Sequence, residues 1–296
     1  MRAETMRCAR PLGRRGRRHV LAGIALLVAA LLPLSTAGLA MARPASGAGD
    51  RISLSSNVEQ LSVRPCLPET IRLGITNNGS KAEFVDVTIT AEQPLQASKP
   101  GVTTYVPAHS TVEVSIRISA TIDAAAGTYD VGFHTGRSET LHVPITVVTS
   151  SPDTRCLPRE NMTATATSAQ ASPDYGPRFA IDGTDTTMWH TQYSPVRDIL
   201  PQAITLDLGG SYDIAELVYQ PRTSGNLNGT ITAYTIYGSA DNQTFTELTE
   251  GTWAADRTRK TAAVDAMAVR YLRLEAREGV GGYGSAAEIV LYGKPA

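Results

Sequence analysis

The sequence predicts an all-β protein with two β-sandwich domains, at residues 50–150 and 161–296. Both regions consist of short runs in which polar and apolar, often β-branched, residues alternate, and clusters of turn-forming residues separate the runs. Runs of this length and spacing are typical of antiparallel sandwiches. The first region has no stretch with the 3.6-residue periodicity of a long amphipathic helix, and the second has no helix caps. We therefore expect two consecutive sandwiches.

The N-terminal segment, residues 1–42, has the composition of an export signal. Its first 18 residues carry seven arginines and one glutamate, and an apolar run then leads to a closing Ala-Met-Ala. A basic region, an apolar region and an Ala-x-Ala site predict a signal peptide that is cleaved after Ala42. The paired arginines before His19 resemble a twin-arginine signal, which indicates bacterial export. A retained membrane anchor is the alternative, and Pro33 within the apolar run disfavours it. We expect a secreted protein.

Charge limits the classes of partner. Without the N-terminal segment the chain keeps 20 basic and 27 acidic residues, a net charge of −7. An acidic surface repels the phosphates of nucleic acids and of anionic lipids. The sequence therefore predicts no nucleic-acid partner and no strong membrane binding.

Cysteine usage agrees with export. Cys8 would leave with the signal peptide, so Cys66 and Cys156 remain. Two cysteines in an exported protein favour a disulfide between them, which would enclose nearly the whole first domain. The alternative, a reactive thiol, has little support because both cysteines lie beside Leu-Pro at the edges of their segments.

The first domain contains the runs "TIRLGIT", "EFVDVTIT", "STVEVSIRIS" and "AGTYDVGF". Over residues 52–148 it resembles the immunoglobulin-like modules that accompany catalytic domains in bacterial glycosidases, on its "TNNG" turn and its "AGTYDVGF" run. The resemblance implies a spacer, or a docking module for another extracellular protein.

The second domain has motifs in a more specific order. They are "AIDGTDTTMWHT", "ITLDLGGSYDIAELVYQPR", "NLNGTITAYTIYGSADNQTF" and "VRYLRLEA" with "AAEIVLYG". In this order they resemble the discoidin (coagulation-factor type C) domain, a jelly-roll sandwich, and within that group the family 32 carbohydrate-binding modules. The resemblance implies a non-catalytic domain that binds galactose-type glycans and holds a structural calcium ion.

The stretch that begins at Asp182 is rich in hard oxygen donors on a turn opened by Gly183. Calcium takes six to eight such oxygens, several of them backbone carbonyls. The run is not an EF-hand, because it lacks that motif's Gly and closing Glu. The resemblance implies that the ligands are the Asp182 and Glu288 carboxylates, the Thr187 hydroxyl and carbonyl, and the carbonyls of Phe179, Thr184 and Ala287. An Asx-turn without an ion is the alternative.

Sugar recognition needs a flat apolar face for the C–H side of the ring and polar groups for its hydroxyls. The family's sugar-binding positions are filled here by His190, Arg222, Asn228 and the aromatic Tyr283. Trp189 matches the family's core tryptophan. The alternatives are that His190 is an ordinary surface residue, that Arg222 only caps a loop, and that the site is degenerate.

Two other functions stay open. No nucleophile elbow or metalloprotease motif is present, so an unrecognised glycoside-processing enzyme is a minor alternative. A protein- or lipid-binding discoidin adhesion module is the other, with Ile199 and Leu200 of "VRDILP" as candidate exposed apolar residues.

Overall fold

In the part of the chain that the structure describes, the regular elements are β-strands and three short 3₁₀ turns, and the predicted all-β fold class is confirmed. The computed structural model describes residues 51–136, 140–149 and 154–296, all of which lie in one compact unit. The predicted signal peptide, residues 1–42, lies outside the described residues, so its cleavage stays a prediction. Within the described ranges, no helix has the length and apolar character needed to span a bilayer.

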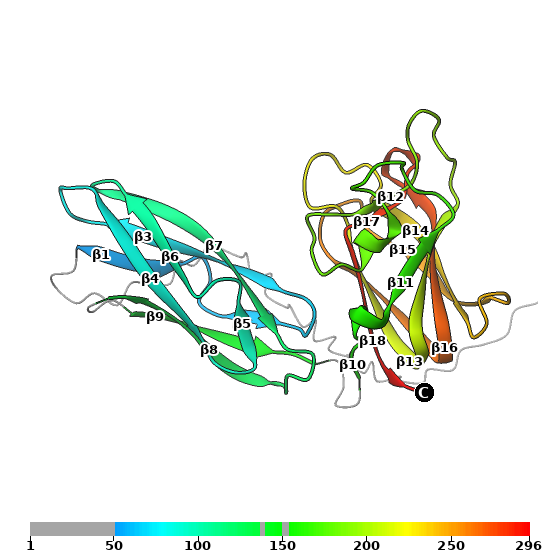
Figure 1. Cartoon of the computed structure of the whole chain (residues 1–296), viewed down its shortest axis with the longest axis horizontal. Helices are drawn as coiled ribbons and strands as arrows, with labels where there is room; N and C mark the ends of the chain where they lie inside the picture. Colours follow the sequence, from blue (N-terminus) through cyan, green and yellow to red (C-terminus); the bar gives the residue numbers. More distant parts are fainter. Residues whose placement is uncertain (1–50, 137–139, 150–153) are drawn as a thin grey trace, which may run out of the picture. The chain divides into compact units, whose positions relative to one another are not determined.

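The first domain consists of a four-stranded and a five-stranded sheet (Figure 1). The strand orders are β1-β3-β7-β5 and β2-β9-β8-β4-β6, and all neighbours are antiparallel except β2 and β9. The strands are β1 (Ile52–Ser56), β2 (Leu61–Val63), β3 (Glu69–Asn77), β4 (Glu83–Ala91), β5 (Leu95–Ala97), β6 (Gly101–Val106), β7 (Ser110–Ala120), β8 (Gly127–Thr135) and β9 (Thr140–Val147).

Period-two alternation builds the core of this first domain. In β4, Val85, Val87 and Ile89 are buried and the residues between them are exposed. These three side chains meet Ile71 and Ile116 of the other sheet in one apolar cluster, so the two sheets form a sandwich. Full burial of each such side chain contributes about 1.5–3 kcal/mol. The further resemblance to immunoglobulin-like modules stays a prediction.

The second domain is dominated by a seven-stranded sheet. Its path is β10-β18-β13-β16-β14-β15, with β11 paired to β13, and a separate ladder joins β12 to β17. Three short 3₁₀ turns, η1 (Arg159–Asn161), η2 (Pro177–Ala180) and η3 (Val280–Gly282), connect strands. The strands are β10 (Arg155–Cys156), β11 (Thr163–Ala166), β12 (Trp189–His190), β13 (Gln202–Gln220), β14 (Ile231–Ser239), β15 (Thr246–Thr252), β16 (Lys260–Gly279), β17 (Ser285–Ala286) and β18 (Glu288–Pro295).

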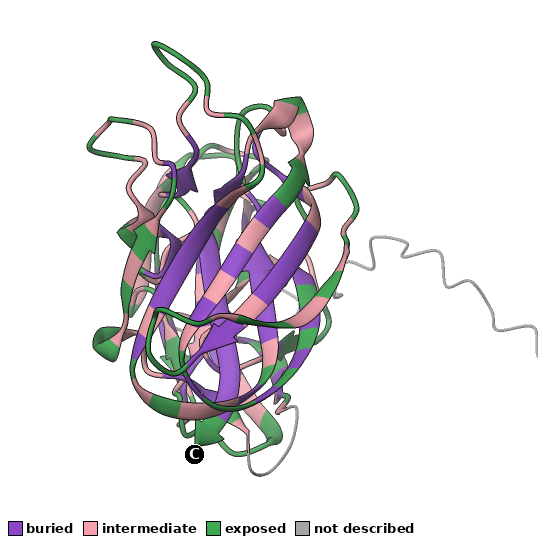
Figure 2. Ribbon diagram, turned by 90° about the vertical axis from the view of Figure 1, so that its right-hand side faces the viewer, coloured by how far each residue is buried: buried purple, intermediate pink, exposed green. Residues whose placement is uncertain are grey.

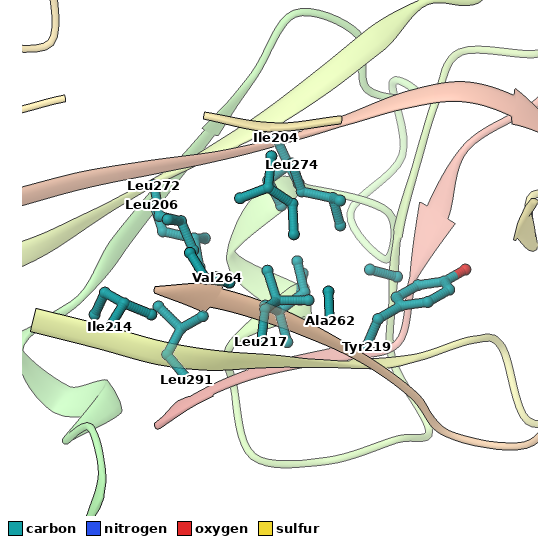
Figure 3. Packing of buried hydrophobic residues seen from close by; sticks show 14 of the residues in the cluster. Ile204, Leu206, Ile214, Leu217, Tyr219, Ala262, Val264, Leu272, Leu274 and Leu291 are labelled. Atoms are coloured by element: carbon teal, nitrogen blue, oxygen red, sulfur yellow. The ribbon is translucent and has the colours of Figure 1, made fainter. Parts of the chain in front are cut away.

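The long strand β13 bends so that its two halves line opposite sides of the core. Its register with β16 shifts between Asp207 and Tyr212, around Gly209. Gly209 has φ +73°, and a Cβ there would approach the Asn161 carbonyl oxygen to 2.5 Å, so only glycine fits. Figure 3 shows Ile204, from before the bend, across the core from Leu217, from after it. In Figure 2 the strands carry most of the buried positions and the loops most of the exposed ones.

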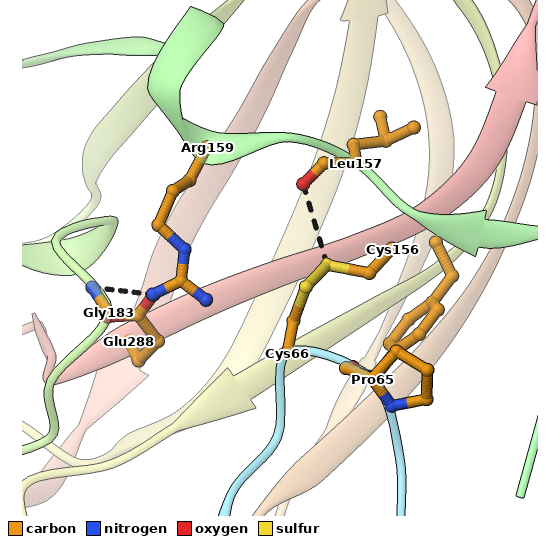
Figure 4. The surroundings of a disulfide bond; sticks show 8 residues. Pro65, Cys66, Cys156, Leu157, Arg159, Gly183 and Glu288 are labelled. Atoms are coloured by element: carbon orange, nitrogen blue, oxygen red, sulfur yellow. Dashed lines mark hydrogen bonds and ion pairs between the residues drawn. A yellow bond between two sulfur atoms is a disulfide. The ribbon is translucent and has the colours of Figure 1, made fainter. Parts of the chain in front are cut away.

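The predicted disulfide between Cys66 and Cys156 is present (Figure 4). Cys66 lies in the turn between β2 and β3, and Cys156 lies in β10. Around it, Leu67 packs with Tyr292 in a small apolar cluster, and the Tyr292 hydroxyl donates to the Pro65 carbonyl at 2.6 Å. The turn that carries Cys66 is therefore held by packing as well as by the covalent bond.

We expect replacement of both cysteines by alanine to lower the free energy of unfolding by about 4–5 kcal/mol, because the bridge closes a long loop and restricts the unfolded chain. Urea denaturation of the chain and of the double variant measures this difference. Mass spectrometry that finds both thiols free in protein produced under oxidising conditions would contradict the pairing.

Candidate functional site

Two short strands organise the loops at one end of the second sandwich. β12 pairs with β17, and Figure 1 shows both at the end of this sandwich opposite the C-terminus. Trp189 is fully buried, and its indole N–H donates to the Ser168 carbonyl at 2.8 Å. The interpretation of Trp189 as a core anchor is confirmed, and its neighbour His190 is thereby fixed at the loop end.

His190 is buried, with 4% of its surface exposed, so the alternative of a surface histidine is wrong. Its Nδ1 lies 2.7 Å from the Thr191 carbonyl oxygen, which only accepts, so Nδ1 carries the proton. In the neutral ring Nε2 is then an acceptor, and it lies beside Gly229, where an added Cβ would approach it to 3.1 Å. Burial lowers the pKa of His190; the bond to Thr191 opposes this, and the charge of Arg222 lowers the pKa further.

Three tyrosine rings surround His190. The ring centroid of Tyr283 lies 5.5 Å from that of His190, at a tilted angle. Tyr193 lies edge-on at 5.3 Å, and Tyr175 lies edge-on at 6.0 Å. Sequence analysis identified Tyr283 and missed the other two. Tyr193 follows His190 by three residues in a polar loop, which is the signal that places it near the site.

Arg222 begins a loop that it also holds together. Its Nε donates to the Ser224 carbonyl at 3.1 Å, and its Nη1 donates to the Asn226 side-chain oxygen at 3.1 Å and to the Asn228 carbonyl at 3.2 Å. The loop-cap role that sequence analysis left as an alternative is therefore present. Nη2 takes no part in these three hydrogen bonds, and it lies 3.3 Å from where a Cβ on Gly225 would lie.

Asn228 and Tyr283 approach each other at Gly281. A Cβ added to Gly281 would lie 2.9 Å from the Asn228 side-chain oxygen and 3.1 Å from Cδ2 of Tyr283. Ser285 is buried at the base of this region, and its hydroxyl has no hydrogen-bond partner within the described part of the chain. The fold thus brings His190, Arg222, Asn228 and Tyr283 together at one loop end.

The predicted calcium ligands also converge. Both Asp182 oxygens are used, Oδ1 accepting from the Thr184 N–H at 3.0 Å and Oδ2 from the Thr187 hydroxyl at 2.7 Å. Glu288, at the start of β18, accepts from the Gly183 N–H at 3.0 Å. Asp182 therefore forms an Asx-turn, whether or not an ion binds, and the Gly183 N–H that follows it contacts Glu288.

Glu288 is a buried carboxyl with a raised pKa. Burial raises the pKa to about 8, against the opposing effects of Arg159 and of the Gly183 N–H, while Asp182 and Asp185 raise it. The Arg159 guanidinium lies 3.6 Å from Glu288 (Figure 4). A buried carboxylate beside a second one is a favourable place for a cation.

The chemistry of this set fits calcium. Its side chains supply two carboxylates and one hydroxyl, from Asp182, Glu288 and Thr187, and all three are hard oxygen donors. Phe179, Thr184 and Ala287 lie in η2, in the same loop and just before β18, where backbone carbonyls can complete a shell. In the ranges that the structure describes, no three His, Cys, Asp or Glu side chains are grouped for a metal.

We expect His190 to titrate below its ordinary pKa of 6.5. Because the folded-state pKa is lowered, the unfolded chain binds more protons just below pH 6.5, and stability falls as the pH decreases through that window. An NMR titration of the imidazole measures the pKa, and the variant His190→Gln should lack this part of the pH dependence. A ring pKa at or above 6.5 would contradict the buried, neutral state.

Comparison with known proteins identifies the second domain. Residues 163–289 match the family model of the F5/8 type C domain. The chain is 37% identical over 159 residues to an A type blood N-acetyl-α-D-galactosamine deacetylase of Flavonifractor plautii, covering 53% of this chain and 20% of that protein. It is 33% identical over 129 residues to galactose oxidase of Gibberella zeae, covering 43% and 19%. A solved family 32 carbohydrate-binding module of Clostridium perfringens, in complex with galactose, is 37% identical with a TM-score of 0.43, covering 47% of this chain and 98% of that one.

The chain spans about a fifth of the length of these two curated relatives. The segment matched by the family model runs from β11 to the beginning of β18, and so contains both groups of predicted ligands. The resemblance on which they were predicted is confirmed, and the second sandwich of this chain, residues 163–289, is an F5/8 type C (discoidin) domain.

Proposed function

We propose that this domain is a non-catalytic carbohydrate-binding domain that recognises galactose-type glycans. The observation that carries the proposal is the convergence, at one loop end, of a buried neutral imidazole, a guanidinium, an amide and a half-buried aromatic ring. These belong to His190, Arg222, Asn228 and Tyr283.

Each group suits one part of a pyranose. The Nε2 of His190 accepts from a hydroxyl, and the Arg222 guanidinium donates to a hydroxyl oxygen from a fixed plane. The Asn228 amide donates and accepts. The Tyr283 ring offers a flat apolar face to the C–H side of the sugar. Galactose presents such a C–H face together with a neighbouring axial hydroxyl, which suits a ring beside hydrogen-bonding groups.

The names of the relatives support a sugar ligand, and their activities belong to much longer proteins. The names of the two curated relatives refer to N-acetylgalactosamine and to galactose, and the segment they share with this chain is about a fifth of each. Glycoside hydrolysis by the common route requires two carboxyl groups across the scissile bond. The four proposed sugar-binding side chains include no carboxyl group. The activities of the whole relatives therefore do not follow from this domain.

Substitutions at Arg222 test the sugar site. We expect Arg222→Ala to abolish detectable binding of galactose, N-acetylgalactosamine and lactose. Their affinities for the unchanged chain should be about 0.1–1 mM, because few hydrogen bonds form and each competes with water. Arg222→Lys should not restore binding, because an ammonium group cannot reproduce the planar guanidinium. Calorimetry measures both. If no sugar binds the unchanged chain, or Arg222→Ala binds equally well, the assignment is wrong.

Removing the aromatic ring of Tyr283 should weaken sugar binding less than removing the Arg222 guanidinium group. Tyr283→Ala should weaken binding by about 1 kcal/mol, since it removes an aromatic contact and leaves the hydrogen-bonding groups in place. Tyr105→Ala, which removes a 53% exposed ring from the first domain, is the matched control and should bind normally. Equal affinities of the two variants would remove Tyr283 from the site.

We also propose that Asp182, Thr187 and Glu288, with the carbonyls of Phe179, Thr184 and Ala287, hold a structural calcium ion. The support is the pairing of a buried carboxylate with a second carboxylate on a loop rich in oxygen donors. Such an ion would tie the loop after η2 to the start of β18 and offset the charge that burial disfavours. In binding, Arg159 would share Glu288 with the ion or turn away from it.

Calcium should raise the melting temperature of the second domain, and EDTA should reverse the effect. An ion present at a hundredfold excess over its dissociation constant stabilises the folded state by about 2.7 kcal/mol. Glu288→Gln should lose the response, and Glu250→Gln, at an exposed position in β15, should keep it. A melting temperature that does not change with calcium or EDTA would rule out the site.

For the rest of the chain we propose export and a supporting role. The N-terminal composition and the Cys66–Cys156 disulfide support secretion from a bacterium. The first sandwich would act as an immunoglobulin-like spacer, or as the docking surface for another extracellular protein. It exposes Phe84 and Tyr105, whose rings contact each other 5.3 Å apart, centroid to centroid.

A membrane- or protein-binding adhesion module is the second candidate function. Ile199 is 75% exposed and Val196 is 70% exposed, on the loop that follows His190. Leu200, the other predicted apolar residue of this loop, instead packs partly buried against the domain core. One of the two predicted exposed residues is therefore available, and Val196 adds to it.

A further inference from the structure

Two glutamine side chains, Gln170 and Gln192, hold the loop of residues 192–201 by hydrogen bonds. The Gln170 side-chain oxygen accepts from the N–H groups of Tyr193 and Ser194 at 2.8 and 3.0 Å, and its amide donates to the Ser194 carbonyl at 3.1 Å. Farther along, the Gln192 amide donates to the Val196 carbonyl at 3.1 Å. These hydrogen bonds restrict the loop, and restriction of this kind lowers the entropic cost of ordering a loop on binding.

The acidic residue of this loop faces inward. One oxygen of Asp198 accepts from the Ser168 hydroxyl at 2.7 Å, and the backbone N–H of Asp198 donates to the Gln192 carbonyl at 3.1 Å. The Asp198 carboxylate is therefore committed to the same Ser168 whose carbonyl holds Trp189. It is not turned toward its exposed neighbour, Arg197.

Arg197 is exposed and lies at the edge of the proposed sugar site. Its Nη1 donates to the Gly281 carbonyl at 3.3 Å, and its guanidinium carbon lies 5.6 Å from the centroid of the Tyr283 ring. No carboxylate lies within 4.0 Å of this guanidinium within the described ranges, whereas Arg159, Arg270 and Arg277 of the same domain each pair with one. The hydrogen bond to the uncharged Gly281 carbonyl therefore positions the Arg197 guanidinium group.

Like Arg197, Arg222 donates only to neutral groups, since all three of its hydrogen-bond partners are uncharged oxygens. Two guanidinium groups without a carboxylate partner among the described residues therefore lie at this loop end, Arg197 by the Tyr283 ring and Arg222 near His190. The chain has a net charge of −7 after its predicted signal, and these two cations lie beside the candidate ligand site. Guanidinium groups bind carboxylates and sulfates through charge-assisted, paired hydrogen bonds.

We propose that Arg197 selects glycans that carry an anionic group, a sulfate ester or a sugar carboxylate, next to the galactose-type unit held by His190, Arg222, Asn228 and Tyr283. This inference rests on the proposed sugar site and adds the charge of its ligand. The Tyr283 ring would stack on the galactose-type sugar. Arg197 would bind an anionic group on that sugar or on the adjacent sugar of the glycan. Because Arg197 is exposed and unpaired, it loses little when it binds the anion.

Calorimetry on the chain compares lactose with its 3′- and 6′-sulfated forms and with 3′- and 6′-sialyllactose. We expect at least one acidic ligand to bind five times more tightly than lactose or better, and the two pairs of ligands distinguish sulfate from carboxylate. The preference should shrink as salt rises from 50 to 500 mM, because the charge is exposed and screened.

Two variants show whether a preference for acidic ligands comes from Arg197 itself or from the net charge of the chain. Arg197→Gln should remove the preference while lactose affinity changes less than twofold. Arg155→Gln is the matched control, since it makes the same change of charge at an exposed position in β10, near the other end of the last strand, and it should keep the preference.

Each possible result contradicts a particular part of the proposal. If lactose binds and every acidic ligand binds no more tightly, the charge selection is wrong and the sugar site stands. If Arg155→Gln loses the preference as much as Arg197→Gln does, the effect is general charge and the assignment to Arg197 is wrong. If the chain binds phosphatidylserine vesicles through Arg197 and shows no preference for acidic sugars, the loop is a membrane contact instead. If no sugar binds at all, the sugar site and the charge selection both fail.

Discussion

The four residues of the ladder between β12 and β17 are the constraint on which both candidate sites depend. They join Trp189–His190 to Ser285–Ala286, which come from distant parts of the domain sequence. Tyr283 lies two residues before this ladder and Glu288 two residues after it, so the ring proposed to stack on a sugar and the buried carboxyl group lie in one short segment. On the opposite strand, Thr187 precedes Trp189 by two residues. Neither set of ligands can form unless the ladder forms, and the fully buried indole of Trp189 is what fixes its position against the core.

Backbone hydrogen bonds extend this constraint into the neighbouring loops. The Thr191 N–H donates to the Gly284 carbonyl at 2.8 Å, and the Ser285 N–H donates to the Gly229 carbonyl at 2.7 Å. The Gly229 position tolerates no side chain, because its φ is +89° and a Cβ would lie 2.5 Å from the Ser285 hydroxyl. The three loops that carry His190, Asn228 and Tyr283 are therefore tied to one another through main-chain groups. A site assembled in this way is organised before the ligand arrives, and that reduces the entropy lost on binding.

Whether a structural feature can be predicted from the sequence depends on how far apart in the chain the residues that determine it lie. Alternation within a strand is local, so the burial of Val85, Val87 and Ile89 follows from the sequence alone. The proposed sugar-binding and calcium sets were predicted only because their motifs resemble a known family, since no local pattern relates His190 to Arg222. Tyr175, Arg159 and Arg197 were missed because their roles arise from loop contacts that neither periodicity nor motif order encodes. The burial of His190 was left open for the same reason, because it depends on three tyrosine rings from separate segments.

The last strand of the chain determines when the second domain can be completed during synthesis. β18 pairs with β10 at the beginning of the domain and with β13 in its middle, and it starts at Glu288. The first sandwich has all its strands between Ile52 and Val147, so it has every partner it needs long before that strand leaves the ribosome. The second sandwich, dominated by pairings between remote residues, is incomplete until β18 has been made and is expected to fold slowly. A nascent chain that stops before β18 would then carry a complete first sandwich and a second one without its closing strand, with the unpaired edge of β13 open to other chains.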